Sequence, residues 1–219
     1  MTLVEVTLPL TCNPGHICLL SVSCNFDSRL CLGWSQSTAD VFDWTRGTGS
    51  TPSSDTGPSS DHTIESGYYM YIEASSPREQ GDNAKLVLSL PGNGELGCLS
   101  FYYHMYGDGM GTLNVFSGNM VVFTESGDHD NIWIKADRTI VLGNNLTFEG
   151  IRGSNYKSDL AIDDVLVTNG SCTTRAGCAD KMPANVCDAL SRLNLCTAVN
   201  NITLKNCAKT CGFCEGDKS

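Results

Sequence analysis

The side chains most able to do chemistry in this sequence are twelve cysteines and four histidines. The histidines are His16, His62, His104 and His129, which lie in different segments and share no spacing typical of paired metal ligands. The sequence also lacks an HExxH zinc-protease helix, a GxSxG nucleophile elbow and a phosphate-binding glycine loop. We therefore expect a chain without catalytic activity.

One pair of cysteines has a spacing that is known from redox and zinc sites. Cys211 and Cys214 form a CxxC motif, which is redox-active in a thioredoxin-like context and binds zinc in others. The redox context is a strand followed by a helix inside a βαβ unit, and the surrounding sequence predicts no such unit. A structural disulfide role is therefore expected for both residues.

The cysteine content also indicates a compartment. Twelve is a high and even number, and disulfides persist outside the cell. Asn-x-Ser/Thr sequons for N-glycosylation begin at Asn145, Asn169 and Asn201. Together these features predict an extracellular or secreted chain, or an ectodomain, with glycans at these three asparagines.

The first ten residues do not supply the export signal that this setting requires. MTLVEVTLPL has no basic segment, and Glu5 and Pro9 interrupt its apolar residues, so no signal peptide is predicted. We expect a fragment, a mature form, or a gene model that lacks its first exon. No apolar run reaches the ~18 residues of a membrane span, so no membrane insertion within this chain is predicted. The formal net charge of −10 disfavours nucleic acid as a partner.

The elements that must position these side chains read as short β-strands. Leu99, Phe101, Tyr103 and Met105 alternate with more polar residues, which is the period of a half-buried strand. Strands are predicted over 67–74, 85–90, 98–116 with a glycine-rich turn inside it, 120–124, 132–135, 139–142, 146–150 and 159–172. Such short strands, bounded by Gly, Asn, Asp or Pro, indicate an all-β sandwich or jelly roll. Residues 47–63 are predicted to form a mobile surface loop.

Two cross-links would stabilise such a sandwich to different extents. A Cys24–Cys31 bond would close a short loop worth about 2–3 kcal/mol, and a Cys98–Cys172 bond a loop of about 75 residues worth about 4–5 kcal/mol. Cys12 and Cys18 could pair with each other or with cysteines of an upstream module, and the sequence leaves both alternatives open.

Residues 24–172 resemble the MAM domain, an extracellular β-sandwich module. The matching pieces are CNFD with CLGW, GYYMYIEAS, CLSFYYHMYGDGMGTLNV and DLAIDDVLVTNGSC, in that order. The resemblance implies a mainly β, MAM-type jelly-roll sandwich, the disulfides Cys24–Cys31 and Cys98–Cys172, and a role in adhesion and oligomerisation.

The composition changes after Cys172. Residues 178–214 hold six cysteines, and so short a segment cannot bury enough apolar surface to fold unaided. Six cysteines allow about fifteen pairings, among which spacing alone does not choose. Residues 185–193 and 204–210 are compatible with two short helices.

This segment resembles the ShKT domain, named after a sea-anemone potassium-channel toxin. The CxD opening at Cys178 and the CxKTCGxC ending at Cys214 carry the resemblance. It implies a small disulfide-rich helical domain with the pairs Cys178–Cys214, Cys187–Cys207 and Cys196–Cys211.

The acidic pair Asp163–Asp164 raises the question of a cation. One of two neighbouring carboxylates on a strand must face inward or toward an end loop, where it needs a partner. Some sandwiches that resemble the MAM domain bind a cation where the opening loop meets the closing strand. The candidate ligands of a structural calcium ion are then Asp27, Asp61, Asp163 and Asp164. The alternatives, which require no cofactor, are hydrogen bonds to backbone amides or ion pairs with Arg46 or Arg152.

We therefore expect a lead segment (1–23), a MAM domain (24–172), a linker (173–177), a ShKT domain (178–214) and a tail (215–219). The expected function is non-catalytic recognition or adhesion, with extracellular or cell-surface proteins or a second copy of the chain as partner. The order of the two modules resembles the C-terminal part of secreted astacin-type metalloproteases, so the chain could be an accessory region of a larger protein. A secreted ion-channel modulator is the other alternative, although Asn201 and Ile202 replace the Lys–Tyr pair of channel-blocking members.

Overall fold

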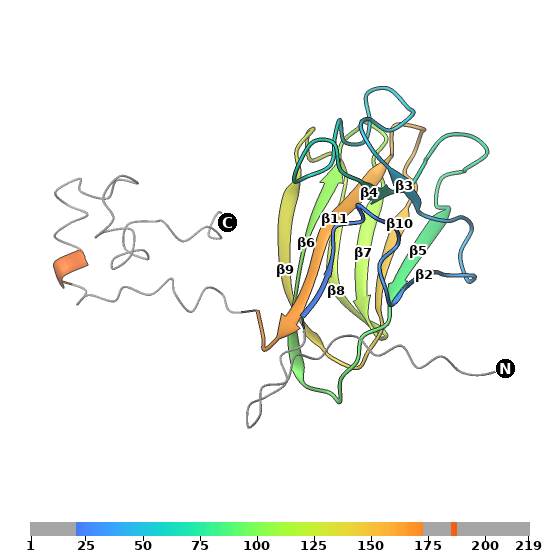
Figure 1. Ribbon diagram of the computed structural model, residues 1–219. Helices are drawn as coiled ribbons and strands as arrows, with labels where there is room; N and C mark the ends of the chain where they lie inside the picture. Colours follow the sequence, from blue (N-terminus) through green and yellow to red (C-terminus); the bar gives the residue numbers. More distant parts are fainter. Residues whose placement is uncertain (1–20, 173–184, 188–219) are drawn as a thin grey trace. The chain divides into compact units, whose positions relative to one another are not determined.

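The computed structural model describes residues 21–172 and 185–187. The chain divides into two compact units, residues 1–172 and 173–219. The described part of the first unit is a sandwich of two antiparallel sheets (Figure 1), which confirms the predicted mainly β fold.

The two sheets take up strands from distant parts of the sequence. One sheet has the order β3 (Thr45–Gly47), β4 (Tyr69–Tyr71), β11 (Leu160–Asn169), β6 (Leu96–Met105) and β9 (Ile134–Val141), and β1 (Ser21–Cys24) also pairs with β11. The other has the order β2 (Trp34–Gln36), β5 (Asn83–Leu88), β10 (Leu146–Ile151), β7 (Thr112–Ser117) and β8 (Met120–Ser126). The last strand, β11, therefore lies inside its sheet, between β6 on one edge and both β4 and β1 on the other.

The core lies between the sheets and follows the alternation of the strands. Leu99, Phe101, Tyr103 and Met105 of β6 are all buried, as their spacing predicts. Phe101 packs edge-on against Phe148 of β10 with 5.2 Å between ring centroids, so the inward faces of the two sheets meet there.

Two predictions about local structure were wrong. The predicted strands 132–135 and 139–142 form one strand, β9, because an edge strand tolerates charged residues. Asp137 is exposed on its solvent side, and the Arg138 guanidinium lies over the Phe123 ring. Residues 47–63 do not lie wholly at the surface, since Thr51, Thr56 and Asp61 are buried. Thr56, for example, donates a hydrogen bond from its hydroxyl to the carbonyl of Tyr106.

Two disulfides cross-link the sandwich. Cys24 bonds to Cys31 and Cys98 bonds to Cys172, with Cα–Cα distances of 5.9 and 4.4 Å. In the second unit, residues 185–187 are helical and Cys187 is disulfide-bonded. The other cysteines that the sequence analysis paired lie outside the described residues: Cys12, Cys18, Cys178, Cys196, Cys207, Cys211 and Cys214.

Candidate functional site

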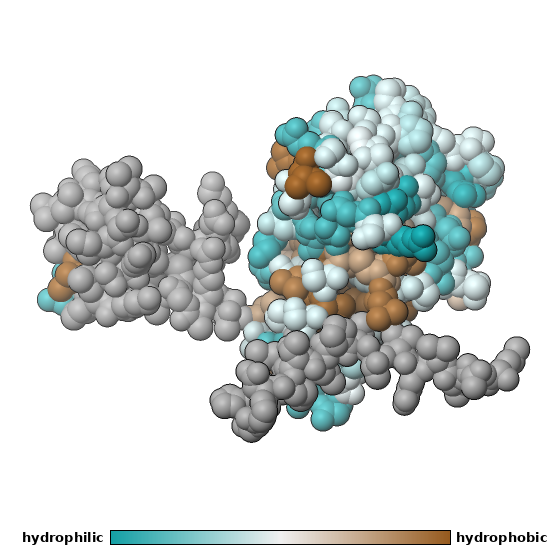
Figure 2. Space-filling view, viewed as in Figure 1, coloured by the Kyte–Doolittle hydropathy of each residue, from teal (hydrophilic) through white to brown (hydrophobic). Residues whose placement is uncertain are grey.

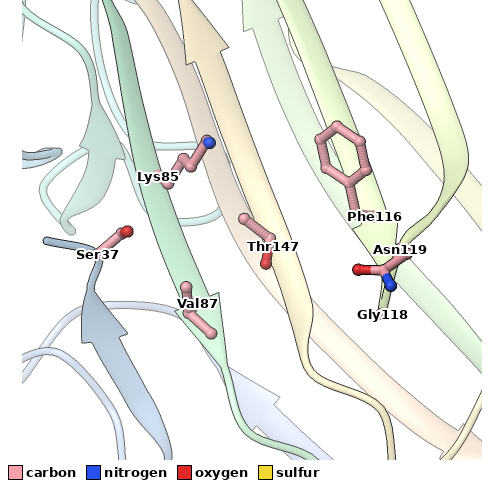
Figure 3. A pocket seen from close by; sticks show the side chains of 7 residues that line it. All are labelled: Ser37, Lys85, Val87, Phe116, Gly118, Asn119 and Thr147. Atoms are coloured by element: carbon pink, nitrogen blue, oxygen red, sulfur yellow. The ribbon is translucent and has the colours of Figure 1, made fainter. Parts of the chain in front are cut away.

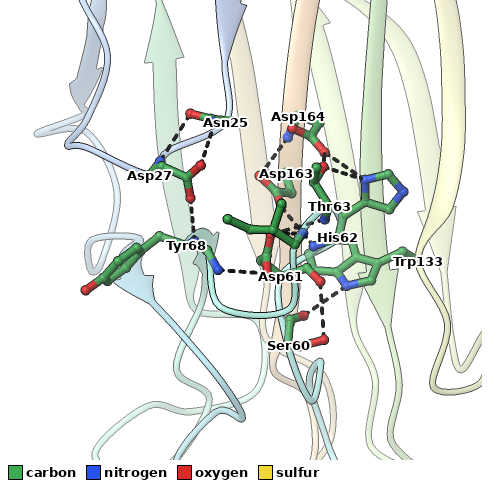
Figure 4. A network of polar contacts seen from close by, with 12 residues as sticks. Asn25, Asp27, Ser60, Asp61, His62, Thr63, Tyr68, Trp133, Asp163 and Asp164 are labelled. Carbon is green, nitrogen blue, oxygen red and sulfur yellow. Dashed lines mark hydrogen bonds and ion pairs between the residues drawn. The ribbon is translucent and has the colours of Figure 1, made fainter.

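The four candidate calcium ligands gather around one surface loop, residues 60–68 (Figure 4). Asp61 lies in this loop and is 5% exposed. Its Oδ2 accepts hydrogen bonds from the amides of Thr63 and Ile64, both at 3.1 Å, and its Oδ1 accepts one from the amide of Gly67 at 2.9 Å. The loop is thus folded around its own buried carboxylate.

Strand β11 supplies the two neighbouring aspartates at an irregularity in its pairing. The register with β6 shifts between Asp163 and Leu166, and Asp164 has a positive φ of 48°. Asp163 lies on the outer side of this sheet, opposite Tyr102 of β6, where residues 60–68 cover it, whereas Asp164 stays partly exposed.

Asp163 is 1% exposed and ties β11 to the loop. Its Oδ2 accepts the amide of His62 at 3.1 Å, and its Oδ1 accepts the amide of Asp164 at 2.7 Å. Burial raises the pKa of Asp163 to about 7, and the nearby carboxylates of Asp164 and Asp61 add to the rise, while the two amides oppose it. The protonated form of Asp163 is therefore favoured relative to that of a solvent-exposed aspartate.

Asp164 holds the other side of the same loop through His62. His62 Nδ1 lies 2.7 Å from Asp164 Oδ2, and the Thr63 hydroxyl donates to the same oxygen. The His62 ring stacks on Tyr102 of β6 with 3.4 Å between ring centroids. The sequence analysis missed His62 because it treated each histidine alone; its position directly after Asp61 was the available signal.

Asp27 joins the opening segment of the sandwich to the end of the loop. Its Oδ1 accepts the amide of Tyr68 at 2.9 Å, and its Oδ2 accepts the side-chain amide of Asn25 at 2.6 Å. Arg46 donates to the backbone carbonyls of Phe26 and Asp27 and lies over the Tyr68 ring.

The two arginines considered as ion-pair partners form none of the expected contacts with these carboxylates. Arg46 donates to the backbone carbonyls named above, and Arg152 donates to the carbonyls of Ala74 and Gly153. Backbone amides are therefore the principal partners of Asp61 and Asp163 in this structure.

The fit of a calcium ion can be judged from Gly67. A Cβ added at Gly67 would lie 2.6 Å from both Asp27 Oδ1 and Asp61 Oδ2, so these carboxylates face one cradle of hard oxygen donors. Within the described part of the chain, however, no three His, Cys, Asp or Glu side chains are arranged to hold a metal ion. Calcium at these aspartates stays a prediction.

The remaining candidate residues lie elsewhere. Asn145 is exposed in the turn before β10, Asn169 ends β11, and Asn201 lies outside the described residues. His104 is buried and donates through Nε2 to Asn131 Oδ1 at 2.9 Å, and burial lowers its pKa to about 4. The His104 ring packs edge-on against Trp133, with 5.4 Å between ring centroids, and is part of the packing of β6.

Comparisons with known proteins identify the families that the two parts of the chain match. Residues 24–173 match the family described as MAM domain, meprin/A5/mu, and residues 177–214 match ShK domain-like. MAM domain-containing glycosylphosphatidylinositol anchor protein 1 of Rattus norvegicus is 38% identical over 191 residues, covering 79% of this chain and 20% of that protein. Thyroid hormone-induced protein B of Xenopus laevis is 40% identical over 160 residues, covering 68% of this chain and 23% of that protein.

The chain thus spans about a fifth of the length of these curated relatives, whose names state no enzymatic activity. Among solved structures, the K1 cleaved adhesin domain of Lys-gingipain from Porphyromonas gingivalis W83 has a TM-score of 0.52 at 14% identity, and the match covers 69% of this chain and 99% of that one. This likeness shows the fold alone. None of the helical residues that the structure describes belongs to a segment long and apolar enough to cross a bilayer.

Proposed function

Because the chain belongs to the MAM domain family, we propose that it is a non-catalytic, extracellular recognition module that binds a protein at or near the cell surface. Relatives named for a glycosylphosphatidylinositol anchor support a cell-surface setting. The two disulfides of the sandwich support an oxidising compartment.

The observation that carries the proposal is a pair of loops that present apolar side chains to solvent on a fixed support. We call residues 60–68 and 127–133 the loop pair. Ile64 in the first loop is 57% exposed, and Ile132 in the second is 56% exposed. On the face shown in Figure 2, apolar residues, in brown, form separate patches among polar ones. Exposed apolar side chains are therefore confined to parts of this face.

The loop pair is held together by several contacts. Trp133 Nε1 donates to the carbonyl of Ser60 at 3.0 Å, and the side-chain amide of Asn131 donates to the Ser59 hydroxyl at 3.3 Å. The first loop is also held by three carboxylates, those of Asp61, Asp163 and Asp164, which accept hydrogen bonds from Thr63 and His62. A pre-organised surface loses little conformational entropy on binding, which favours recognition.

Beads coated with the purified chain test this proposal. We expect them to attach to cells that display the partner, or to aggregate with each other if the partner is a second copy, more than albumin-coated beads do. The double variant Ile64→Asp/Ile132→Asp should reduce attachment at least tenfold. A tenfold reduction corresponds to a loss of about 1.4 kcal/mol in the free energy of binding. Met120→Asp on β8 is the matched control, because Met120 is also 57% exposed but lies on the other sheet.

Coated beads that neither attach nor aggregate above the albumin level would contradict the proposed function. Equal losses in the double variant and in the control would contradict the assignment of the loop pair as the contact surface.

A further inference from the structure

The outer face of the five-stranded sheet carries a hollow of about 300 Å³ (Figure 3). Thr147 of β10 lies at its centre, because its two cross-strand neighbours are Val87 of β5 and Phe116 of β7. Ser37, Lys85, Gly118 and Asn119 complete the lining. The hollow thus combines apolar surface with hydroxyl, amide and ammonium groups.

A network of hydrogen bonds around Glu149 lies beside the hollow. Glu149 of β10 is 8% exposed, and its Oε1 accepts the side-chain amide of Asn83 at 2.7 Å and lies 3.4 Å from Lys85 Nζ. Its Oε2 accepts the side-chain amide of Asn114 at 3.2 Å. Since both carboxylate oxygens have partners, Glu149 orients Lys85 at the edge of the hollow.

The sequon that begins at Asn145 ends at Thr147, inside the hollow. Leu146 is buried in the core, whereas Asn145 is exposed and Thr147 is half-buried on the outer face. Alternation along the chain therefore sends the Asn145 and Thr147 side chains to the same side of the sheet. The backbone carbonyl of Asn145 also accepts the amide of Gly118, which lines the hollow, at 2.9 Å.

We propose that this hollow seats the first sugars of an N-glycan carried by Asn145. The proposal rests on the extracellular setting of the proposed function, because the glycan is added in the secretory pathway. There Asn145 Nδ2 loses a proton and takes the glycan from a lipid pyrophosphate donor, which leaves as the lipid pyrophosphate.

The chemistry of the hollow suits a sugar ring. Such a ring has an apolar C–H face, which Phe116 and Val87 can cover, and a rim of hydroxyl and N-acetyl groups. Ser37, Asn119 and Lys85 offer hydrogen bonds to that rim. Because the glycan is tethered two residues from Thr147, its effective concentration is in the mM range, so even a weak contact is populated. A seated glycan would close this sheet face to a protein partner and leave the loop pair free.

The test uses the full chain secreted from a eukaryotic host. Intact-mass and glycopeptide measurements report whether Asn145 is occupied. The glycoamidase PNGase F is then applied to the native protein, and the rate at which it releases the Asn145 glycan is measured. This native release rate reports how often the glycan dissociates from the hollow. Phe116→Ser should raise the native release rate at Asn145 about tenfold, and Leu96→Ser should leave it within about twofold. Leu96 is the control because it is an exposed apolar residue on the other sheet, outside both the hollow and the loop pair.

A second measurement covers the case in which Phe116→Ser does not fold. In the wild-type protein, nuclear Overhauser contacts are expected between the Phe116 ring protons and the first sugar on Asn145. An unoccupied Asn145, equal release rates in Phe116→Ser and wild type, or absent contacts in a folded, glycosylated protein would each overturn the proposal. Bead attachment is scored separately, so failure of the recognition function leaves these readouts intact.

Discussion

The two disulfides of the sandwich should differ in what they contribute to stability, and the difference can be calculated. Cys98–Cys172 joins residues 74 apart, whereas Cys24–Cys31 joins residues only 7 apart. The chain-entropy relation gives about 4.5 kcal/mol for the longer loop and about 2.5 kcal/mol for the shorter one. The double variant Cys98→Ala/Cys172→Ala should therefore lose about 2 kcal/mol more of the free energy of unfolding than Cys24→Ala/Cys31→Ala.

Urea unfolding followed by tryptophan fluorescence measures this difference. The three tryptophans of the chain are Trp34, Trp44 and Trp133, all within the sandwich, so the signal does not report the second unit. A second readout is the m-value, which should rise when the longer cross-link is removed, because the unfolded chain then exposes more surface.

Two results would refute the reasoning. One is an equal or larger loss of stability in the variant without Cys24–Cys31, and the other is an m-value that stays constant when Cys98–Cys172 is removed. Either result would mean that native packing around the sulfur atoms, and not loop closure in the unfolded chain, determines the contribution.

Three further predictions concern the aspartate-held loop. The first compares the free energies of unfolding of the wild type and Asp163→Asn, measured with a chelator that removes divalent cations. The difference, wild type minus variant, should fall by up to about 1.4 kcal/mol per pH unit as the pH rises from about 4 to about 7, because the folded state holds the Asp163 proton more tightly than the unfolded chain. A difference that stays constant at all pH values in urea unfolding would contradict this prediction. Gly67→Ala should cost about 2 kcal/mol in urea unfolding, because its Cβ would meet Asp27 Oδ1 and Asp61 Oδ2 at 2.6 Å, and an unchanged midpoint would refute this steric conflict. Calcium at a hundredfold excess over its dissociation constant should add about 2.7 kcal/mol to the wild type and less to Asp27→Asn; a calorimetric melting temperature that calcium does not move would argue against the ion.

Much of the sandwich could be predicted because alternation is a local signal. In β11, the apolar residues Leu160, Ile162, Val165 and Val167 are spaced by two, three and two, and all four are buried. The step of three marks the bulge between Asp163 and Leu166, a signal that the sequence analysis did not use. The extent of β9 was not predicted, because its charged residues are tolerated only at the edge of a sheet.

The site was predicted less completely, because its contacts are between distant segments. The four aspartates were identified as one group, but the choice among calcium, arginine and backbone amides depends on where residues 60–68 fold. His62 and Asp164 are separated by 102 residues, and no local pattern links them. The hollow around Thr147 was missed for the same reason, since Val87 and Phe116 become its neighbours only through strand pairing.

The pairing of β1 with β11 has a mechanical consequence. Ser21 lies opposite Thr168 in an antiparallel pair, so the backbone enters and leaves the sandwich side by side. Tension between residues 21 and 172 would peel β1 away one hydrogen bond at a time, which demands little force. On the C-terminal side the load would meet a covalent link, because Cys172 is bonded to Cys98 on β6 and β11 cannot be drawn off its neighbour. Extension would therefore begin at the N-terminal strand and expose Val22 and Cys24 of the core first.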